Sequence, residues 1–236
     1  EDVNEGIDDN VPLTPAQLAL KYQMKLKAPG GSYTAVNASD TWYLDSATDT
    51  YAGYADVTDL VKAGGAGDYW GADVQTCTGK GGCFGSWSLT VAWANPSEPA
   101  RNLTVWHGWK NTLPGESNIN TVTGLVPPPN GPVNARLGVV NADGDLGFPD
   151  SFEVSTPSTA WQRLSTIDRP LNPSDGADWF NSTINYFGQR RPNSDAAPNY
   201  LANMNIDIAQ VDTNILSNTD TSLSFRTTSP ADSGEQ

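Results

Sequence analysis

The stretch SWSLTVAWA, residues 86–94, decides the fold class that we predict for this chain. Its large apolar residues fall at every second position, and serine, threonine and alanine lie between them. A period of two residues is typical of a β-strand with one buried face. After the turn-forming residues 95–99 (NPSEP), residues 102–109 repeat the alternation, with Leu103, Val105 and His107 on one face. We therefore predict that residues 86–94 and 102–109 form an antiparallel pair.

Similar patterns recur along the chain. They cover residues 18–27, 41–44, 51–55, 135–140, 151–155 and 222–227. Residues 168–205 lack such a pattern and are rich in Asn, Pro, Asp and Ser, which is typical of an elaborated surface loop. We predict an all-β fold, an antiparallel, jelly-roll-like β-sandwich with long surface loops. It would be a single domain over residues 13–236, after a flexible acidic leader at residues 1–12.

Two short segments carry helix signals. Thr14 and Gln17 have the spacing of a capping box. The alternation of apolar residues and lysines over residues 18–27 favours a strand instead, and we predict the strand, ended by a turn at residues 29–31. For residues 56–61 we predict one helical turn, with Asp56 as its N-cap and a stop at the following glycines.

Composition excludes several function classes. The 236 residues include 13 Lys and Arg against 27 Asp and Glu, a net charge of −14. This charge argues against binding to nucleic acid and against adhesion to an anionic membrane. No apolar run is long enough to predict direct membrane insertion. The first ten residues lack the apolar core of a signal peptide, so we expect a mature or excised fragment.

The only two cysteines, Cys77 and Cys83, lie in the segment CTGKGGC. Its three glycines form a tight loop that could bring the two sulfur atoms together. We predict a Cys77–Cys83 disulfide worth about 2 kcal/mol, since the loop it closes is short. Two free thiols are the alternative. A disulfide implies an oxidising, extracytoplasmic setting.

Seven segments together resemble one protein family. They are residues 54–61 (YADVTDLV), 85–91 (GSWSLTV), 99–105 (PARNLTV), 106–108 (WHG), 131–138 (GPVNARLG), 143–145 (DGD) and 181–182 (NS). In this order they resemble the large N-terminal β domain of bacterial and archaeal cell-surface proteins, which precedes repeated stalk domains such as isopeptide-forming ones. The resemblance implies exposure on the cell envelope and a role in adhesion or fibre assembly. It also implies stalk domains of the same polypeptide as partners, and it brings no catalytic motif.

The loop NADGDLGFPD, residues 141–150, is the candidate metal site. Asn141, Asp143, Asp145 and Asp150 place three carboxylates and an amide on a glycine-bent turn. Hard oxygen ligands on a flexible turn suit Ca²⁺, although the spacing is not that of an EF-hand. The alternative is that these residues only form turns. Asp207 and Asp212, further along, are either structural partners or part of a solvated strand face.

Tryptophans in or beside predicted loops are the candidate ligand-binding residues. Trp106, Trp109 and Trp179 could stack against the apolar face of a sugar ring, and Trp70 has a similar setting. Tryptophan is also highly buried on average. For each of these residues taken singly, we favour the alternative that the ring closes an end of the sandwich core.

No catalytic residues are predicted. Glu98, Glu116 and Glu153 are the glutamates in the body of the chain, and none lies in a glycosidase-like motif. His107 is the only histidine, and its alternation with Leu103 and Val105 favours a packed side chain. No G-x-S-x-G motif surrounds any serine. We therefore do not expect an enzyme.

Two functional hypotheses follow. The first is an extracellular adhesin or fibre domain, attached to the cell envelope and stabilised by calcium. It would bind a protein or glycan on a host or neighbouring cell. The second is a carbohydrate-binding module with a platform of loop tryptophans. A glycan array on variants of Trp106 and Trp179 would separate the two.

Overall fold

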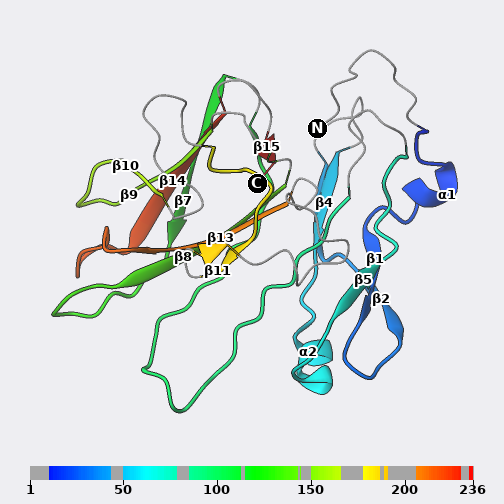
Figure 1. Cartoon of the computed structure of the whole chain (residues 1–236), viewed down its shortest axis with the longest axis horizontal. Coiled ribbons are helices and arrows are strands. Elements are labelled where there is room, and N and C mark those ends of the chain that lie inside the picture. The colour runs from blue at the N-terminus through cyan, green and yellow to red at the C-terminus, as the bar shows by residue number, and fades with distance from the viewer. Residues whose placement is uncertain are drawn as a thin grey trace. The chain divides into compact units, whose positions relative to one another are not determined.

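The computed structural model of the chain describes residues 11–43, 50–78, 85–112, 115–142, 144, 150–165, 178–186, 189–190, 206–229 and 234–235 (Figure 1). Strands make up 39% of the structure and helices 7%. The sheets are antiparallel, which confirms the predicted all-β, sandwich-like class. Contacts within the chain form two compact units, residues 1–89 and residues 90–236, which we describe separately. The boundary falls inside residues 86–94, where we predicted a strand within one domain.

The first unit is built around a small sheet. Its elements are α1 (Pro15–Leu18), β1 (Gln23–Lys27), β2 (Tyr33–Asn37), β3 (Asp40–Tyr43), β4 (Tyr51–Tyr54), α2 (Thr58–Gly64) and β5 (Trp70–Ala72). Strand β1 lies between β2 and β5, while β3 and β4 form a separate hairpin. Leu26 of β1 is buried, at 3% exposed. Beside it, a Cβ on Gly71 would clash with the ring of Trp87, so the glycine leaves room for the indole ring to pack on the sheet.

The start of this unit corrects one prediction. Residues 15–18 form a short helix, and both hydrogen bonds of the capping box between Thr14 and Gln17 are present. The local cap therefore prevails over the alternation up to residue 22, and the strand begins only at Gln23. The second helix is confirmed, but Val57 is its N-cap. Asp56 instead accepts a hydrogen bond from the Thr58 N–H at 2.8 Å.

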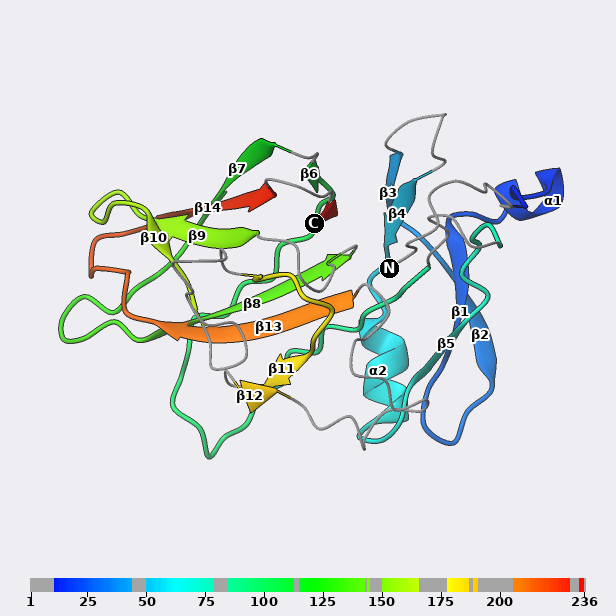
Figure 2. The same ribbon diagram turned by 45° about the horizontal axis from the view of Figure 1, so that its top comes forward.

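Two four-stranded sheets form the second unit (Figure 2). One has the order β10 (Gln162–Arg163), β9 (Ser151–Ser155), β14 (Ser222–Ser229), β7 (Glu116–Thr123), and the other β13 (Ile206–Thr213), β8 (Ala135–Ala142), β15 (Gly234–Glu235), β6 (Asn111–Thr112). A small pair, β11 (Asn185–Tyr186) and β12 (Gln189–Arg190), lies outside both sheets. The longest ladders are β8 with β13 and β7 with β14.

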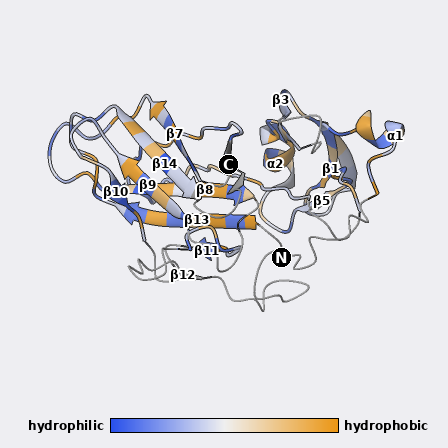
Figure 3. Cartoon of the chain, turned by 90° about the horizontal axis from the view of Figure 1, so that it is seen from above, coloured by the Kyte–Doolittle hydropathy of each residue, from blue (hydrophilic) through white to orange (hydrophobic). Residues whose placement is uncertain are grey.

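The core of the second unit combines residues from both sheets and from a connecting loop. Figure 3 shows hydrophobic residues on β8, β9 and β13. The buried members are Phe152, Val154, Leu164, Trp179, Phe180, Ala209, Val211, Ile215 and Leu223. Trp179 is fully buried and its ring centroid lies 4.8 Å from that of Phe152. Aromatic packing therefore forms the centre of this core.

Other strand predictions have mixed outcomes. The strands predicted at residues 41–44, 51–55, 135–140, 151–155 and 222–227 are present within a few residues. Residues 86–94 and 102–109 are wrong as strands, because neither has a ladder partner among the described residues. Their alternation leads to little burial, since the side chain of Trp93 is 76% exposed. We did not predict β7. For Asp207 and Asp212 we left open whether they lie on a solvated strand face or are structural partners. The segments 116–123 and 206–213 are both strands.

Candidate functional site

The outer face of the first sheet carries a row of three side chains, in which a half-buried lysine lies between two exposed aromatic residues. Lys27 of β1 pairs in register with Tyr33 of β2 on one side and with Trp70 of β5 on the other. Residues paired directly across a sheet project on the same face. Tyr33 is 48% exposed and Trp70 is 55% exposed. We call Tyr33, Lys27 and Trp70 the aromatic–lysine row.

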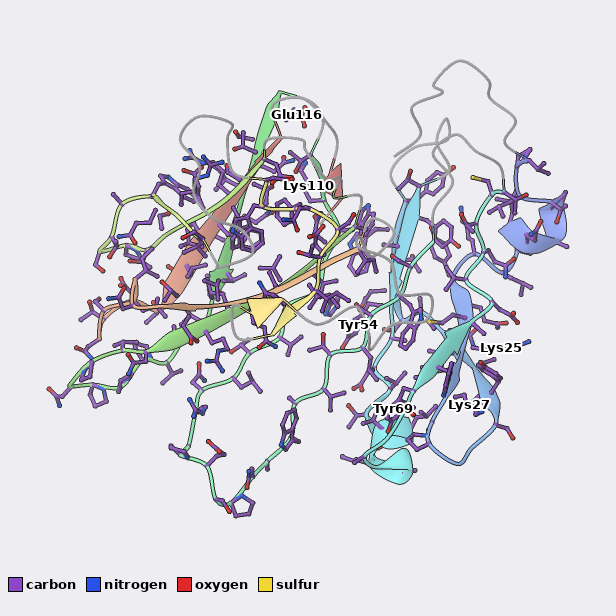
Figure 4. All side chains as sticks on the ribbon, viewed as in Figure 1. Lys25, Lys27, Tyr54, Tyr69, Lys110 and Glu116 are labelled. Atoms are coloured by element: carbon purple, nitrogen blue, oxygen red, sulfur yellow. The ribbon has the colours of Figure 1, made fainter. Side chains whose placement is uncertain are left out.

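The charge of Lys27 is the unusual feature of this row. Its Nζ lies 5.9 Å from the centroid of the Tyr33 ring, within the range of a cation–π contact. Lys27 has no ion pair within the part of the chain that the structure describes. Lys25, two residues earlier on the same face, forms an ion pair with Asp73 at 2.6 Å. Figure 4 labels Lys25 and Lys27 in the first unit. One uncompensated cation therefore lies between two exposed rings.

The surroundings of the row leave it open. The next rung along the sheet pairs Lys25 with Ala35 and Ala72, whose small side chains do not cover the rings. The opposite face carries Leu26, which is buried. Flat aromatic rings can pack against the C–H face of a pyranose, and an ammonium group can donate hydrogen bonds to hydroxyl or carboxylate oxygens. The row therefore has the chemistry to bind a sugar that carries an acidic group.

A second candidate lies at one end of the core in the second unit. The inward positions of β8 are Leu137, Val139 and Asn141, and the ladder pairs Asn141 with Asp207 of β13. Along the inward face of β8, two aliphatic side chains are thus followed by one polar side chain. Asp150, directly before β9 of the other sheet, interacts electrostatically with Asp207. We call Asn141, Asp150 and Asp207 the polar end of the core; each is at least 92% buried, because their exposed fractions are 2%, 8% and 1%.

A loop covers the polar end and donates hydrogen bonds to it. The backbone N–H groups of residues 179 and 180 donate to Oδ1 of Asp150 at 2.6 and 2.8 Å. Those of residues 181, 182 and 183 donate to Asp207 at 3.0, 3.1 and 3.2 Å. The Ser182 hydroxyl also donates to the Gly144 carbonyl, and Ser182 has a left-handed backbone with φ of 56°. The carboxylates thus take the place of water for a buried stretch of backbone.

Burial has a strong effect on Asp150. It raises the pKa of this carboxyl to about 8, although the N–H groups of Phe180 and Trp179 oppose the shift. The negative charges of Asp178 and Asp207 raise the pKa further. The polar end is therefore a site where buried negative charge is costly.

Asn141 has an acceptor with no donor. Its Nδ2 donates to the Ala142 carbonyl at 2.9 Å, which fixes the orientation of the amide. Its Oδ1 is buried and has no hydrogen-bond partner among the described residues. A buried acceptor without a donor is uncommon in folded proteins.

The sequence-predicted metal ligands are only partly placed. Asn141 and Asp150 do lie together at the polar end, whereas Asp143 and Asp145 lie outside the described residues. Sequence reasoning did not assign Asp207 to this group. Its position in the inward alternation with Ala209 and Val211 was the available signal. No group of three or more His, Cys, Asp and Glu side chains in the described ranges is arranged to hold a metal ion.

The three tryptophans predicted to bind a ligand differ in burial. Trp179 is fully buried in the core, so the favoured alternative holds for it and its ring is not available to a sugar. Trp106 is 44% exposed, and Trp109 is half-buried. Trp70, which we noted without naming it as a ligand residue, is the tryptophan of the exposed row.

The remaining candidates do not assemble a reactive group in the described residues. Glu98 is ion-paired with Arg101 at 3.3 Å, and Glu153 with Arg226 at 2.7 Å. His107 is exposed, contrary to the packed side chain that we expected. Cys77 is not free, but Cys83 lies outside the described residues, so the disulfide stays a prediction.

Comparisons of the chain with protein families, with curated proteins and with solved structures found no match. The resemblance to cell-surface proteins therefore stays a prediction. Across the described residues, neither helix has the length and apolar character required to cross a bilayer.

Proposed function

We propose that this chain is an extracellular recognition domain that binds an acidic glycan, such as a uronate-containing polysaccharide, on a neighbouring cell or host. The observation that carries the proposal is the aromatic–lysine row, in which Lys27 lies between the exposed rings of Tyr33 and Trp70. The rings supply sugar-stacking surface and the ammonium group supplies charge for a carboxylate.

The net charge of the whole chain makes Lys27 selective among acidic glycans. With a net charge of −14, the protein repels acidic polymers in general. Binding would therefore depend on short-range contacts at Lys27, because long-range attraction is absent. Salt should then have only a small effect on the binding, because it screens both the repulsion by the whole chain and the contact at Lys27. A sugar that stacks on the two rings and itself carries a carboxylate can make this short-range contact with Lys27.

The extracellular setting is part of the proposal. It rests on the predicted Cys77–Cys83 disulfide, the acidic composition and the sequence resemblance to envelope proteins. In this setting the domain would serve adhesion or fibre assembly next to stalk domains of the same polypeptide. A soluble carbohydrate-binding module would use the same row without the envelope attachment.

The test is a glycan array followed by calorimetric titration with the best acidic oligosaccharide. Trp70→Ala and Tyr33→Ala should each weaken binding by about tenfold, which corresponds to about 1.4 kcal/mol. Lys27→Met keeps the aliphatic stem and removes the charge, so it should lose the preference for acidic over neutral sugars. Trp93→Ala is the matched control, because Trp93 is 76% exposed and lies outside the row.

Two outcomes would overturn the proposal. An array without binding to any glycan, together with binding to a cell-surface protein, would favour protein recognition. Glycan binding that survives the substitutions in the row but is lost in Trp106→Ala would move the platform to the loop tryptophans.

A further inference from the structure

The unpartnered oxygen of Asn141 is where this inference begins. Asn141 is 2% exposed, and its Oδ1 receives no hydrogen bond from the described residues. The Nδ2 bond to the Ala142 carbonyl favours this orientation of the amide, because the flipped amide would place Oδ1 against a carbonyl oxygen. Such an oxygen needs a positive partner, because burial without one is costly.

The neighbours of this oxygen are also acceptors. Asp207 lies directly opposite Asn141 in the ladder, on the same inward face. Side chains paired in this way have Cβ atoms about 5 Å apart. The backbone N–H groups of residues 179–183 all bind to Asp150 or Asp207, and the hydroxyls of Ser182 and Thr183 donate to the Gly144 carbonyl and to Oδ1 of Asn181. None of them reaches Asn141.

Oδ2 of Asp150 is a further side-chain oxygen that can bind a cation. Both N–H bonds to this side chain end on Oδ1, and Oδ2 accepts none from the described residues. The polar end therefore combines two carboxylates and one amide oxygen and has more acceptors than donors. A cation supplies what this set lacks, since no N–H or O–H group of the described residues is bonded to Oδ1 of Asn141.

We propose that the polar end of the core binds one calcium ion through Oδ1 of Asn141 and the carboxylates of Asp150 and Asp207. Carboxylate and amide oxygens are hard ligands, which calcium accepts in flexible geometry. Magnesium is disfavoured, because it keeps several water molecules and this site is buried. Zinc is disfavoured, because the ligand set contains neither histidine nor cysteine.

This site differs from a metal centre made only of acidic side chains. The described residues hold no group of three such side chains suited to a metal, and here the third ligand is an amide. The ion would join β8 and β13 of one sheet to the residue that precedes β9 of the other. It would also fix the loop of residues 179–183, whose N–H groups bind the same carboxylates. Calcium binding at the polar end does not depend on glycan binding by the first unit.

Calorimetric titration of the whole chain with CaCl₂, after removal of metals with EDTA, tests the site. We expect one ion to bind, with a preference for calcium over magnesium. Asn141→Leu keeps the side-chain size but removes the amide oxygen, and it should weaken calcium binding by at least about tenfold. Asp212→Asn is the matched control, because Asp212 lies on the same strand but is exposed and paired with Arg136. Its affinity for calcium should be unchanged.

Terbium luminescence gives a second readout. Trp179 lies next to the site through its N–H bond to Asp150, so excitation of tryptophan should sensitise a bound Tb³⁺ ion. Calcium should displace the signal, and Trp179→Phe should reduce it without loss of calcium binding.

If Asn141→Leu does not fold, Asn141→Asp serves instead, and it should bind calcium more tightly than the natural chain. The proposal is overturned if the natural chain binds no calcium. It is also overturned if Asn141→Leu binds calcium as well as the natural chain does, or if Asn141→Asp does not bind more tightly.

Discussion

Replacement of Asp207 by asparagine tests how the loop of residues 179–183 is held in place. Asparagine keeps one oxygen for the N–H groups of residues 181 and 183, which now donate at 3.0 and 3.2 Å. It places an NH₂ group against the N–H of Ser182, which now donates at 3.1 Å. The unsatisfied N–H costs about 1–3 kcal/mol, and the change of two charge-assisted bonds to neutral ones costs about 1 kcal/mol each.

We expect Asp207→Asn to lower the free energy of unfolding by about 3 kcal/mol. This is the low end of the range, because loss of the Asp207 charge also relieves its repulsion of Asp150. Urea unfolding in EDTA measures the effect without a bound cation, and hydrogen exchange of amides 181–183 measures it locally. Asp212→Asn is the control and should cost less than about 1 kcal/mol, since its ion pair with Arg136 is exposed. The reasoning fails if the two variants lose the same stability, or if the three amides stay protected in Asp207→Asn.

Two further predictions concern the second unit. Trp179→Ala should lower the free energy of unfolding by about 3–5 kcal/mol, because it leaves a cavity beside Phe152; a loss below about 1 kcal/mol in thermal or urea unfolding would contradict the buried placement. Burial alone would raise the pKa of Asp220, but hydrogen bonds from Ser158, Ser217 and Thr156 lower it from 3.8 to about 2. The ionised form is therefore favoured by folding, so this contribution to stability is present above pH 4 and is lost as the pH falls toward 2. Asp220→Asn should flatten this acid limb in unfolding curves measured from pH 5 to pH 2, and an unchanged limb would refute it.

Sequence periodicity predicted strands well where a long ladder supports them. Strand β8 pairs along its whole length with β13, and its alternation reflects real burial. Residues 86–94 have an equally clear alternation but no ladder partner among the described residues. Alternation in sequence describes what a strand would bury, and only a partner, which lies far away along the chain, decides whether the strand forms.

The candidate sites show the same limit. Asn141 and Asp150 could be predicted, because they lie in one polar, glycine-bent segment. Asp207 could not be assigned to them, since its pairing with Asn141 depends on the register of two strands 66 positions apart (207 − 141). Likewise, Lys27 and Trp70 become neighbours only through the pairing of β1 with β5. The local sequence contains each half of a site, and the sheet registers bring the halves together.

The loop of residues 178–183 explains why polar composition predicted the wrong environment. We expected residues 168–205 to lie on the surface, yet residues 179–183 are buried and contribute Trp179 and Phe180 to the core. A loop can be buried only if its backbone groups find partners inside the protein. Here the carboxylates of Asp150 and Asp207 provide those partners for five consecutive N–H groups. Closing this end of the core with aromatic side chains thus requires the burial of two carboxyl groups, which is costly when they are ionised. A bound cation would lower that cost.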